Sequence, residues 1–266
     1  MSGRGLPMKM VEKVWGRTHL PPPFAAPEGQ RIGEIWFEPP PELPGILAKY
    51  LFTSEKLSVQ VHPSDAQAPA GSRGKEECWL VLDAEPGATL AIGFERSVGA
   101  DEMRAAALDG SIERLLAWHP VQAGDFFYLP AGTVHAIGPG LSLVEIQQNS
   151  DVTYRLYDYG RPRDLHLDEG IAVASGAPCD PANMRPVGES GAATLVEGPH
   201  FRLDRVAGAP AEAVAARYAG PLLVMPLAGA ADIGGERIEA GGCGLAADIA
   251  AVDLGACRSA LLTQPA

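Results

Sequence analysis

Short runs of alternating apolar and polar residues recur along most of the chain and predict β-strands, because strand side chains point to opposite faces in turn. Segments rich in Gly and Pro separate the runs and favour tight turns. Two runs, 47–53 and 57–62, are separated by Ser54-Glu55-Lys56 only, a spacing typical of a hairpin. The strands predicted in the first part of the chain are 32–37, 47–53, 57–62, 76–84, 88–94, 121–129, 141–148 and 153–159.

The period of the pattern changes between residues 100 and 118. Met103, Ala107, Ile112 and Leu115 recur there at helical spacing. We therefore expect a helical insertion at about 97–119, divided into two helices at Asp109-Gly110. It would cover one end of a sheet or barrel.

Turn-rich segments divide the chain into parts. Residues 1–30 are rich in Pro and Gly and predict an irregular arm, and 177–190 predict a linker. Residues 191–266 carry a second set of short strand patterns and only one histidine, His200. The prediction is a mainly β protein with a larger domain at 1–176 and a smaller, degenerate β-barrel at 191–266.

Composition narrows the class of partner. The 266 residues carry a formal net charge of −12, which disfavours broad binding to nucleic acid or to an anionic membrane. The four cysteines show no CxxC spacing, as expected of reduced thiols. The chain shows neither a signal-peptide pattern nor an apolar run of membrane-spanning length. These features predict a cytoplasmic protein, a monomer or weak homodimer, whose partner is a small molecule.

The stretch Leu57–Pro63 has an unusual polar face. Its apolar residues point one way, and Ser58, Gln60 and His62 point the other. Buried polar groups need partners, and a metal ion would be one. We therefore expect Gln60 and His62 to hold one divalent metal together with Glu77 and His135, inside a small β-barrel.

Two motifs fit the pattern of cupin barrels. Gly124-x5-Pro130-x-Gly132-x2-His135 matches the second cupin motif, and Gln60-x-His62 stands where the first motif usually has His-x-His. Two imidazoles, one carboxylate and one amide oxygen suit Zn²⁺, although Fe²⁺, Mn²⁺ or Co²⁺ would also be accepted. The fold class expected is thus a cupin (jelly-roll) β-barrel with the helical insertion and the smaller C-terminal domain.

Between about residues 14 and 173, the chain resembles the short bacterial form of the type I mannose-6-phosphate isomerases. The resemblance is carried by Leu57-Ser-Val-Gln-Val-His-Pro63, Gly74-Lys-Glu-Glu-Cys-Trp79, the stretch 124–136, and Gln147-Gln-Asn-Ser-Asp-Val-Thr-Tyr-Arg-Leu-Tyr-Asp158. It implies interconversion of mannose 6-phosphate and fructose 6-phosphate through a cis-enediol, with 1–176 as the catalytic domain. It also implies one Zn²⁺ per chain, bound by Gln60, His62, Glu77 and His135.

The resemblance implies further site residues. Arg155 matches an essential arginine of the family, and an enediolate needs such a cation beside it. Glu145, Asp151 and Lys75 are the candidates for proton transfer, which requires a carboxylate or lysine in the pocket. The residues expected to contact substrate or phosphate are Lys49, Ser58 and Arg161.

Other interpretations stay open at this point. Glu145 could form a structural bridge to Arg155, and Asp151 could be a turn residue. The rival functions are an Fe-dependent cupin dioxygenase and a sugar-phosphate-binding cupin without catalysis. Oxygen uptake would identify the first, and absence of turnover the second.

Overall fold

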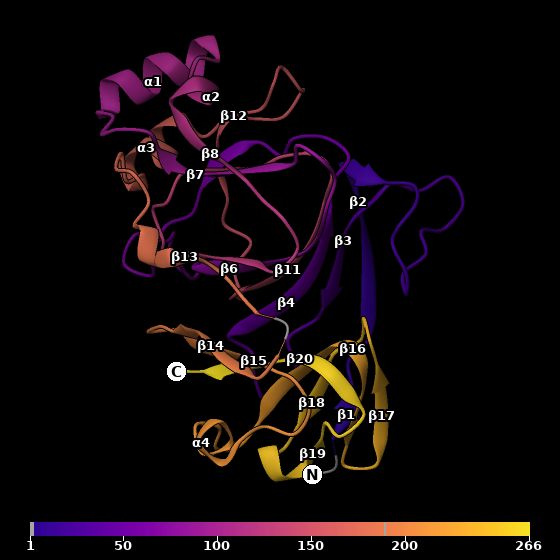
Figure 1. Cartoon of the computed structure of the whole chain (residues 1–266). Helices are drawn as coiled ribbons and strands as arrows, with labels where there is room; N and C mark the ends of the chain where they lie inside the picture. Colours follow the sequence, from indigo (N-terminus) through magenta and orange to yellow (C-terminus); the bar gives the residue numbers. More distant parts are fainter. Residues whose placement is uncertain (1–2, 189) are drawn as a thin grey trace.

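The computed structural model describes residues 3–188 and 190–266, which fold into three antiparallel sheets (Figure 1). The mainly β prediction is confirmed. The expected domain limits remain a prediction. Met1, Ser2 and Glu189, which fall in the predicted first domain and the predicted linker, lie outside the described residues.

Two of the sheets form the larger part of the molecule and face each other. The seven-stranded sheet has the order β13-β9-β6-β11-β4-β3-β2, and the five-stranded sheet has the order β12-β5-β10-β7-β8. The first contains β2 (Met8–Arg17), β3 (Ile32–Phe37), β4 (Ile46–Phe52), β6 (Glu77–Ala84), β9 (Asp125–Leu129), β11 (Leu141–Gln148) and β13 (Met184–Pro186). The second contains β5 (Val59–Val61), β7 (Thr89–Phe94), β8 (Leu116–Pro120), β10 (His135–Ile137) and β12 (Tyr154–Tyr157).

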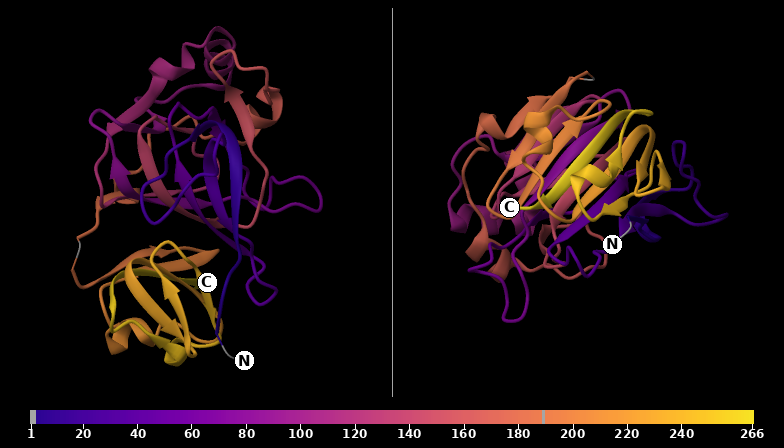
Figure 2. Two further views of the ribbon diagram at one scale, coloured as in Figure 1. Left: turned by 90° about the vertical axis from the view of Figure 1, so that its right-hand side faces the viewer. Right: turned by 90° about the horizontal axis from the view of Figure 1, so that it is seen from below.

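The third sheet forms the smaller part of the molecule, drawn in orange and yellow (Figure 2). Its path runs β1-β18-β16-β20-β15-β14, with β17 and β19 paired to β16. The first described strand therefore lies within the sheet of the last third of the chain. The strands are β1 (Arg4–Gly5), β14 (Ala192–Glu197), β15 (Phe201–Val206), β16 (Leu222–Ile233), β17 (Glu236–Glu239), β18 (Gly244–Ala246), β19 (Val252–Asp253) and β20 (Cys257–Pro265).

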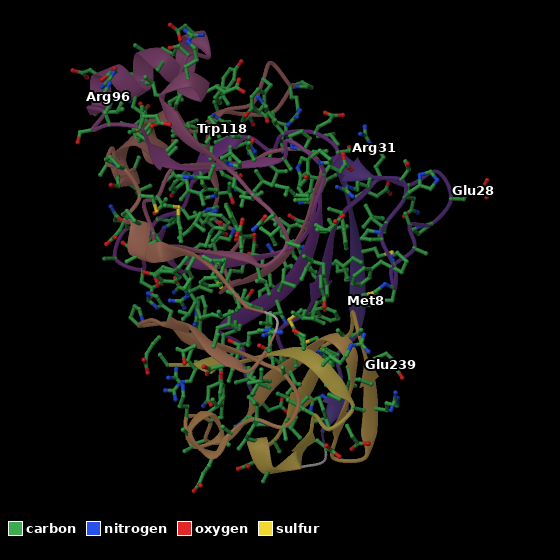
Figure 3. All side chains as sticks on the ribbon, in the orientation of Figure 1. Met8, Glu28, Arg31, Arg96, Trp118 and Glu239 are labelled. Atoms are coloured by element: carbon green, nitrogen blue, oxygen red, sulfur yellow. The ribbon has the colours of Figure 1, made fainter. Side chains whose placement is uncertain are left out.

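Helices cover the five-stranded sheet on its outer face. Met103 and Ile112 pack in one buried cluster with Val59, Phe94 and Leu156 of that sheet. Arg96 and Trp118 mark this end of the molecule, away from Glu239 (Figure 3). The helices at this end are α1 (Ala100–Asp109), α2 (Ile112–Leu115) and α3 (Leu167–Val173). A further helix, α4 (Glu212–Ala215), lies beside the third sheet, and 3₁₀ turns occur at Pro181–Asn183 and Ile249–Ala251. Among the described residues, no helix is long and apolar enough to cross a membrane.

The seven-stranded sheet is covered on both faces. Tyr50 and Phe126 pack on its outer side against Leu203 and Met225 of the third sheet. On its other side, Trp79 packs in a cluster with Ile137. This double burial explains why every residue of β4 is buried, and it holds the strands that carry the site between two cores.

Two local predictions are wrong, and two element limits differ from the expected ones. Residues 8–17, expected in an irregular arm, form β2, because they pair with β3. The segments 47–53 and 57–62 form no hairpin: β4 pairs with β3 and β11, and β5 pairs with β10 and β12. The helical region ends at Leu115, where β8 begins and pairs with β7. The expected linker contains β13, which pairs with β9.

Candidate metal centre and substrate cavity

Two rows of side chains from the facing sheets define the site. In the five-stranded sheet, His135 is the register partner of Gln60, and Gln60 is the partner of Arg155. Directly opposed residues of antiparallel strands share one face, so these three side chains form one row. In the seven-stranded sheet, Glu145 is the register partner of both Lys49 and Trp79, so these three side chains form a second row.

His62, Glu77 and His135 converge between the two sheets, and one ligand atom of each lies within 4.8 Å of the others. The Nε2 atoms of His62 and His135 lie 3.6 and 3.3 Å from the Glu77 carboxylate. All three residues are buried. The structure thus brings together three of the residues that the sequence analysis expected to lie close to one another.

The histidines are oriented by backbone carbonyls. Nδ1 of His62 donates to the carbonyl of Val152, and Nδ1 of His135 donates to that of Thr133, both at 2.9 Å. In these tautomers Nε2 carries a lone pair, and both Nε2 atoms face Glu77. This arrangement is typical of metal-binding histidines, whose second nitrogen is held by an acceptor.

Burial sets the charge of the centre. It lowers the pKa of His62, assisted by the Lys75 ammonium, and it also lowers the pKa of His135, so both imidazoles are neutral at neutral pH. Burial alone would raise the pKa of Glu77, but the ammonium of Lys75 outweighs it and the pKa is lowered. The site therefore presents two lone-pair nitrogens and one carboxylate.

The donor set fits a divalent cation. Glu77 Oε1 is buried and accepts no hydrogen bond, and it faces the lone pair of His135 Nε2 at 3.3 Å. A divalent cation between these two electron-rich atoms would give both of them a partner. Gln60 lies beside them and donates from Nε2 to His135 Nε2 at 3.2 Å. Rotation of this amide would offer its oxygen as a further ligand.

Lys75 stands next to the centre. Its ammonium lies 2.7 Å from Glu77 Oε2 and 3.2 Å from His62 Nε2. Burial lowers the pKa of Lys75, but Glu77 and Glu145 more than compensate and the pKa is raised. Lys75 is thus a charged group in the cavity wall, in contact with both sheets.

A cavity of about 620 Å³ adjoins the centre, a size that suits a small-molecule site. His62, Glu77 and His135 do not line it themselves, but Gln60 and Lys75, which contact them, do. Most of the predicted site residues line it: Lys49, Ser58, Gln60, Lys75, Glu145, Asp151 and Arg155. Arg161 is not among the lining residues. Its guanidinium instead contacts Asp158 at 3.2 Å and the carbonyl of Lys56 at 2.6 Å.

Glu145 is bound on both oxygens. Lys49 Nζ lies 3.0 Å from Oε1, and Trp79 Nε1 donates to Oε2 at 3.1 Å. The bridge considered between Glu145 and Arg155 does not form. Within the described part of the chain, the Arg155 guanidinium has no carboxylate partner, so it is available to a ligand in the cavity.

Three basic residues of the cavity wall were not predicted: Lys13, Arg163 and His166. Lys13 lies on β2, a segment expected to be irregular. Arg163 and His166 lie in a polar connection whose sequence has no strand period. This connection folds back onto β12, where the His166 N–H donates to the Arg155 carbonyl at 2.8 Å. That contact brings Arg163 and His166 to the cavity.

Comparisons with known proteins agree with this fold. No protein-family model matches the chain. The chain is 44% identical over 149 residues to a mannose-6-phosphate isomerase of Streptococcus mutans, a match that covers 53% of this chain and 46% of that protein. It is 33% identical over 228 residues to the probable mannose-6-phosphate isomerase GmuF of Bacillus subtilis, a match that covers 70% of this chain and 72% of that protein.

The fold is also that of a solved structure. The chain superposes on the mannose 6-phosphate isomerase of Bacillus subtilis with a TM-score of 0.79, at 23% identity, over 99% of this chain and all of that one. The predicted cupin fold is therefore confirmed. The chain spans about half the length of the curated relatives that it matches at 44% identity. The match to GmuF, in contrast, covers more than two thirds of that protein. The chain therefore belongs to the mannose-6-phosphate isomerase family.

Proposed function

We propose that the protein is a metal-dependent aldose–ketose isomerase that interconverts mannose 6-phosphate and fructose 6-phosphate. The observation that carries the proposal is the buried set of His62, Glu77 and His135, whose neighbours Gln60 and Lys75 line a cavity of about 620 Å³. Arg155 adds to the same cavity a cation that has no carboxylate partner among the described residues. We expect a cytoplasmic monomer or weak homodimer acting on this small substrate.

We assign one Zn²⁺ per chain to the centre. Two neutral imidazoles and a carboxylate, with the Gln60 amide oxygen as fourth ligand, match the borderline donors that Zn²⁺ prefers. When bound, the ion supplies a Lewis acid that polarises a carbonyl or hydroxyl oxygen of the substrate. The carbonyls of Val152 and Thr133 keep the two imidazoles in the binding orientation.

The chain's own residues move the proton. The carboxylate of Glu145 removes the proton from C2 of mannose 6-phosphate, and the electron pair forms the C1–C2 double bond of a cis-enediolate. Arg155 stabilises the negative charge on oxygen. Glu145 then returns the proton to C1, and O2 becomes the carbonyl oxygen of fructose 6-phosphate while O1 takes up a proton. Lys75 and Asp151 are the alternative carriers between the oxygens.

The remaining wall groups hold the sugar. Lys49 is buried at 6% exposure, and its ammonium contacts Glu145 and the face of Trp36. Ser58 is buried and donates to Gln60 Oε1 at 3.2 Å. We assign both to the substrate hydroxyls near the reacting carbons, because they border the proposed base and the proposed metal ligand.

A coupled assay tests the proposed function. The purified protein should convert mannose 6-phosphate to fructose 6-phosphate, with clear preference over glucose 6-phosphate, and a chelator should stop turnover. Readdition of Zn²⁺ should restore it. Oxygen uptake with a bound Fe²⁺ and no isomerisation would instead identify the dioxygenase, and binding without turnover would identify a sugar-phosphate sensor.

A further inference from the structure

The cavity wall contains two basic residues, Arg163 and His166, whose contacts among the described residues involve no proposed metal ligand. At the centre itself, Lys75 is engaged by Glu77 and Lys49 by Glu145. The substrate of the proposed isomerase carries its phosphate on the carbon farthest from the reacting pair. A dianionic phosphate therefore needs donors at a distance from the metal ligands, along the same cavity.

The five-stranded sheet places His166 at that distance. His166 continues the row of His135, Gln60 and Arg155, because its backbone N–H donates to the Arg155 carbonyl and its Nδ1 accepts from the Arg155 N–H at 3.2 Å. Neighbouring strands lie about 4.8 Å apart, so the backbone of His166 lies roughly 10 Å from that of Gln60. The row thus runs from Gln60 and His135 to His166, which lines the cavity.

The hydrogen bond from the Arg155 N–H to Nδ1 determines which nitrogen of the His166 ring can carry a hydrogen. Since Nδ1 accepts a hydrogen bond, the neutral ring carries its hydrogen on Nε2. His166 forms part of the cavity wall, and no side-chain partner within the described residues occupies this second nitrogen. The ring therefore offers an N–H donor to a ligand.

Arg163, three residues before His166 in the chain, also lines the cavity and is held by two hydrogen bonds. Its Nε and Nη2 donate to the two oxygens of Asp158, each at 2.6 Å, and Asp158 is 2% exposed. This bidentate contact fixes the guanidinium plane and leaves the N–H groups of Nη1 for another acceptor. The Arg163 side chain is 30% exposed and lines the cavity.

On the basis of the proposed isomerase function, we propose that Arg163 and His166 bind the phosphate group of the substrate. Arg155 lies between them and the metal ligands in the row, where it reaches the reacting carbons. Arg161, which the family resemblance associates with phosphate, contacts Asp158 and the Lys56 carbonyl outside the cavity wall. The phosphate-binding arginine of this chain is Arg163.

Calorimetric titration with D-mannitol 1-phosphate tests the proposal without turnover, because this reduced form of mannose 6-phosphate has no carbonyl. Arg163→Gln should weaken its binding roughly 10- to 100-fold, the effect of losing a charge-assisted hydrogen bond to phosphate. Arg163→Lys should recover part of the affinity, and His166→Gln should weaken binding less than Arg163→Gln. Unphosphorylated mannitol should bind the wild type and Arg163→Gln equally.

Arg104→Gln is the matched control. It removes the same charge and breaks an exposed ion pair with Asp168, outside the cavity wall, so affinity for D-mannitol 1-phosphate should not change. In the coupled assay, Arg163→Gln should raise KM for mannose 6-phosphate by a similar factor and leave kcat nearly unchanged. Bound metal should be retained, which shows that the variant is folded.

Three results would overturn the phosphate assignment: no binding of D-mannitol 1-phosphate by the wild type, equal binding by Arg163→Gln, or equal loss in Arg104→Gln. Failure of the proposed function is a separate result. A wild-type protein that binds the hexitol phosphate through Arg163 but isomerises no sugar phosphate would refute the isomerase and retain the phosphate site.

Discussion

Glu145 occupies a fixed position in the wall of the cavity. Lys49 binds one of its carboxylate oxygens, Trp79 donates to the other, and the residue is 4% exposed. Each oxygen still has a lone pair that these contacts do not use. A carboxylate that is both held and accessible from the cavity suits a proton carrier, because proton transfer depends first on geometry.

Glu145→Gln should therefore lower kcat for mannose 6-phosphate by roughly 10²- to 10⁴-fold, the usual contribution of a positioned general base. The bound metal should be retained, because Glu145 lies outside the proposed ligand set. Steady-state kinetics and metal analysis on the same preparation measure both effects. Glu239→Gln, an exposed substitution far from the cavity, is the control, and wild-type kcat in Glu145→Gln would exclude this base.

At the residue scale, the sequence predicts the metal ligands better than the substrate contacts. His62 and His135 are recognisable because strand period and a turn motif place them on inward faces. Arg161 and Arg163 are both basic residues in one irregular segment, and no period distinguishes them. Asp158 contacts both guanidinium groups, but Arg161 also donates to the carbonyl of Lys56, which is distant in the sequence. That tertiary contact holds Arg161 out of the cavity wall, which Arg163 lines.

The element α1 stabilises the sheet that carries three of the four proposed metal ligands. Met103 is 2% exposed and packs in the cluster that contains Val59 of β5 and Ala136 of β10. These strands are only three residues long, so they depend on packing from outside the sheet. The helical insertion thus supports the backbone of Gln60 and His135.

Met103→Ala should lower the free energy of unfolding by about 2–5 kcal/mol, the usual result of truncating a buried methionine. Leu108→Ala on the same helix should change it by less than about 0.5 kcal/mol, because Leu108 is 68% exposed. Urea denaturation followed by circular dichroism measures both. Equal stability of the two variants would show that α1 does not support the sheet.

At the scale of single elements, the period of hydrophobic residues does not always predict the structure that a segment forms. Residues 100–115 follow a helical pattern and form α1 and α2, but Leu116 continues the apolar spacing into a strand because β7 offers a hydrogen-bonding edge. The segments 47–53 and 57–62 have hairpin spacing, yet each finds partners in a different sheet. Strand pairing depends on residues distant in sequence, which a local pattern does not contain.

In the whole molecule, the metal centre joins the two facing sheets. Gln60 and His135 belong to strands of the five-stranded sheet and His62 directly follows one of them, whereas Glu77 begins β6 of the seven-stranded sheet. The third sheet packs on the outer face of the seven-stranded sheet and so fixes Glu77 from behind. A bound cation would hold both halves of the cavity in register.

The most direct measurement of the central claim is metal content and turnover on the same protein, for the wild type, His135→Ala and the exposed control His19→Ala. The wild type and His19→Ala should each bind about one divalent ion per chain and isomerise mannose 6-phosphate. His135→Ala should lose the ion and the turnover together. A metal-free His135→Ala protein that still isomerises mannose 6-phosphate would contradict the metal-dependent mechanism.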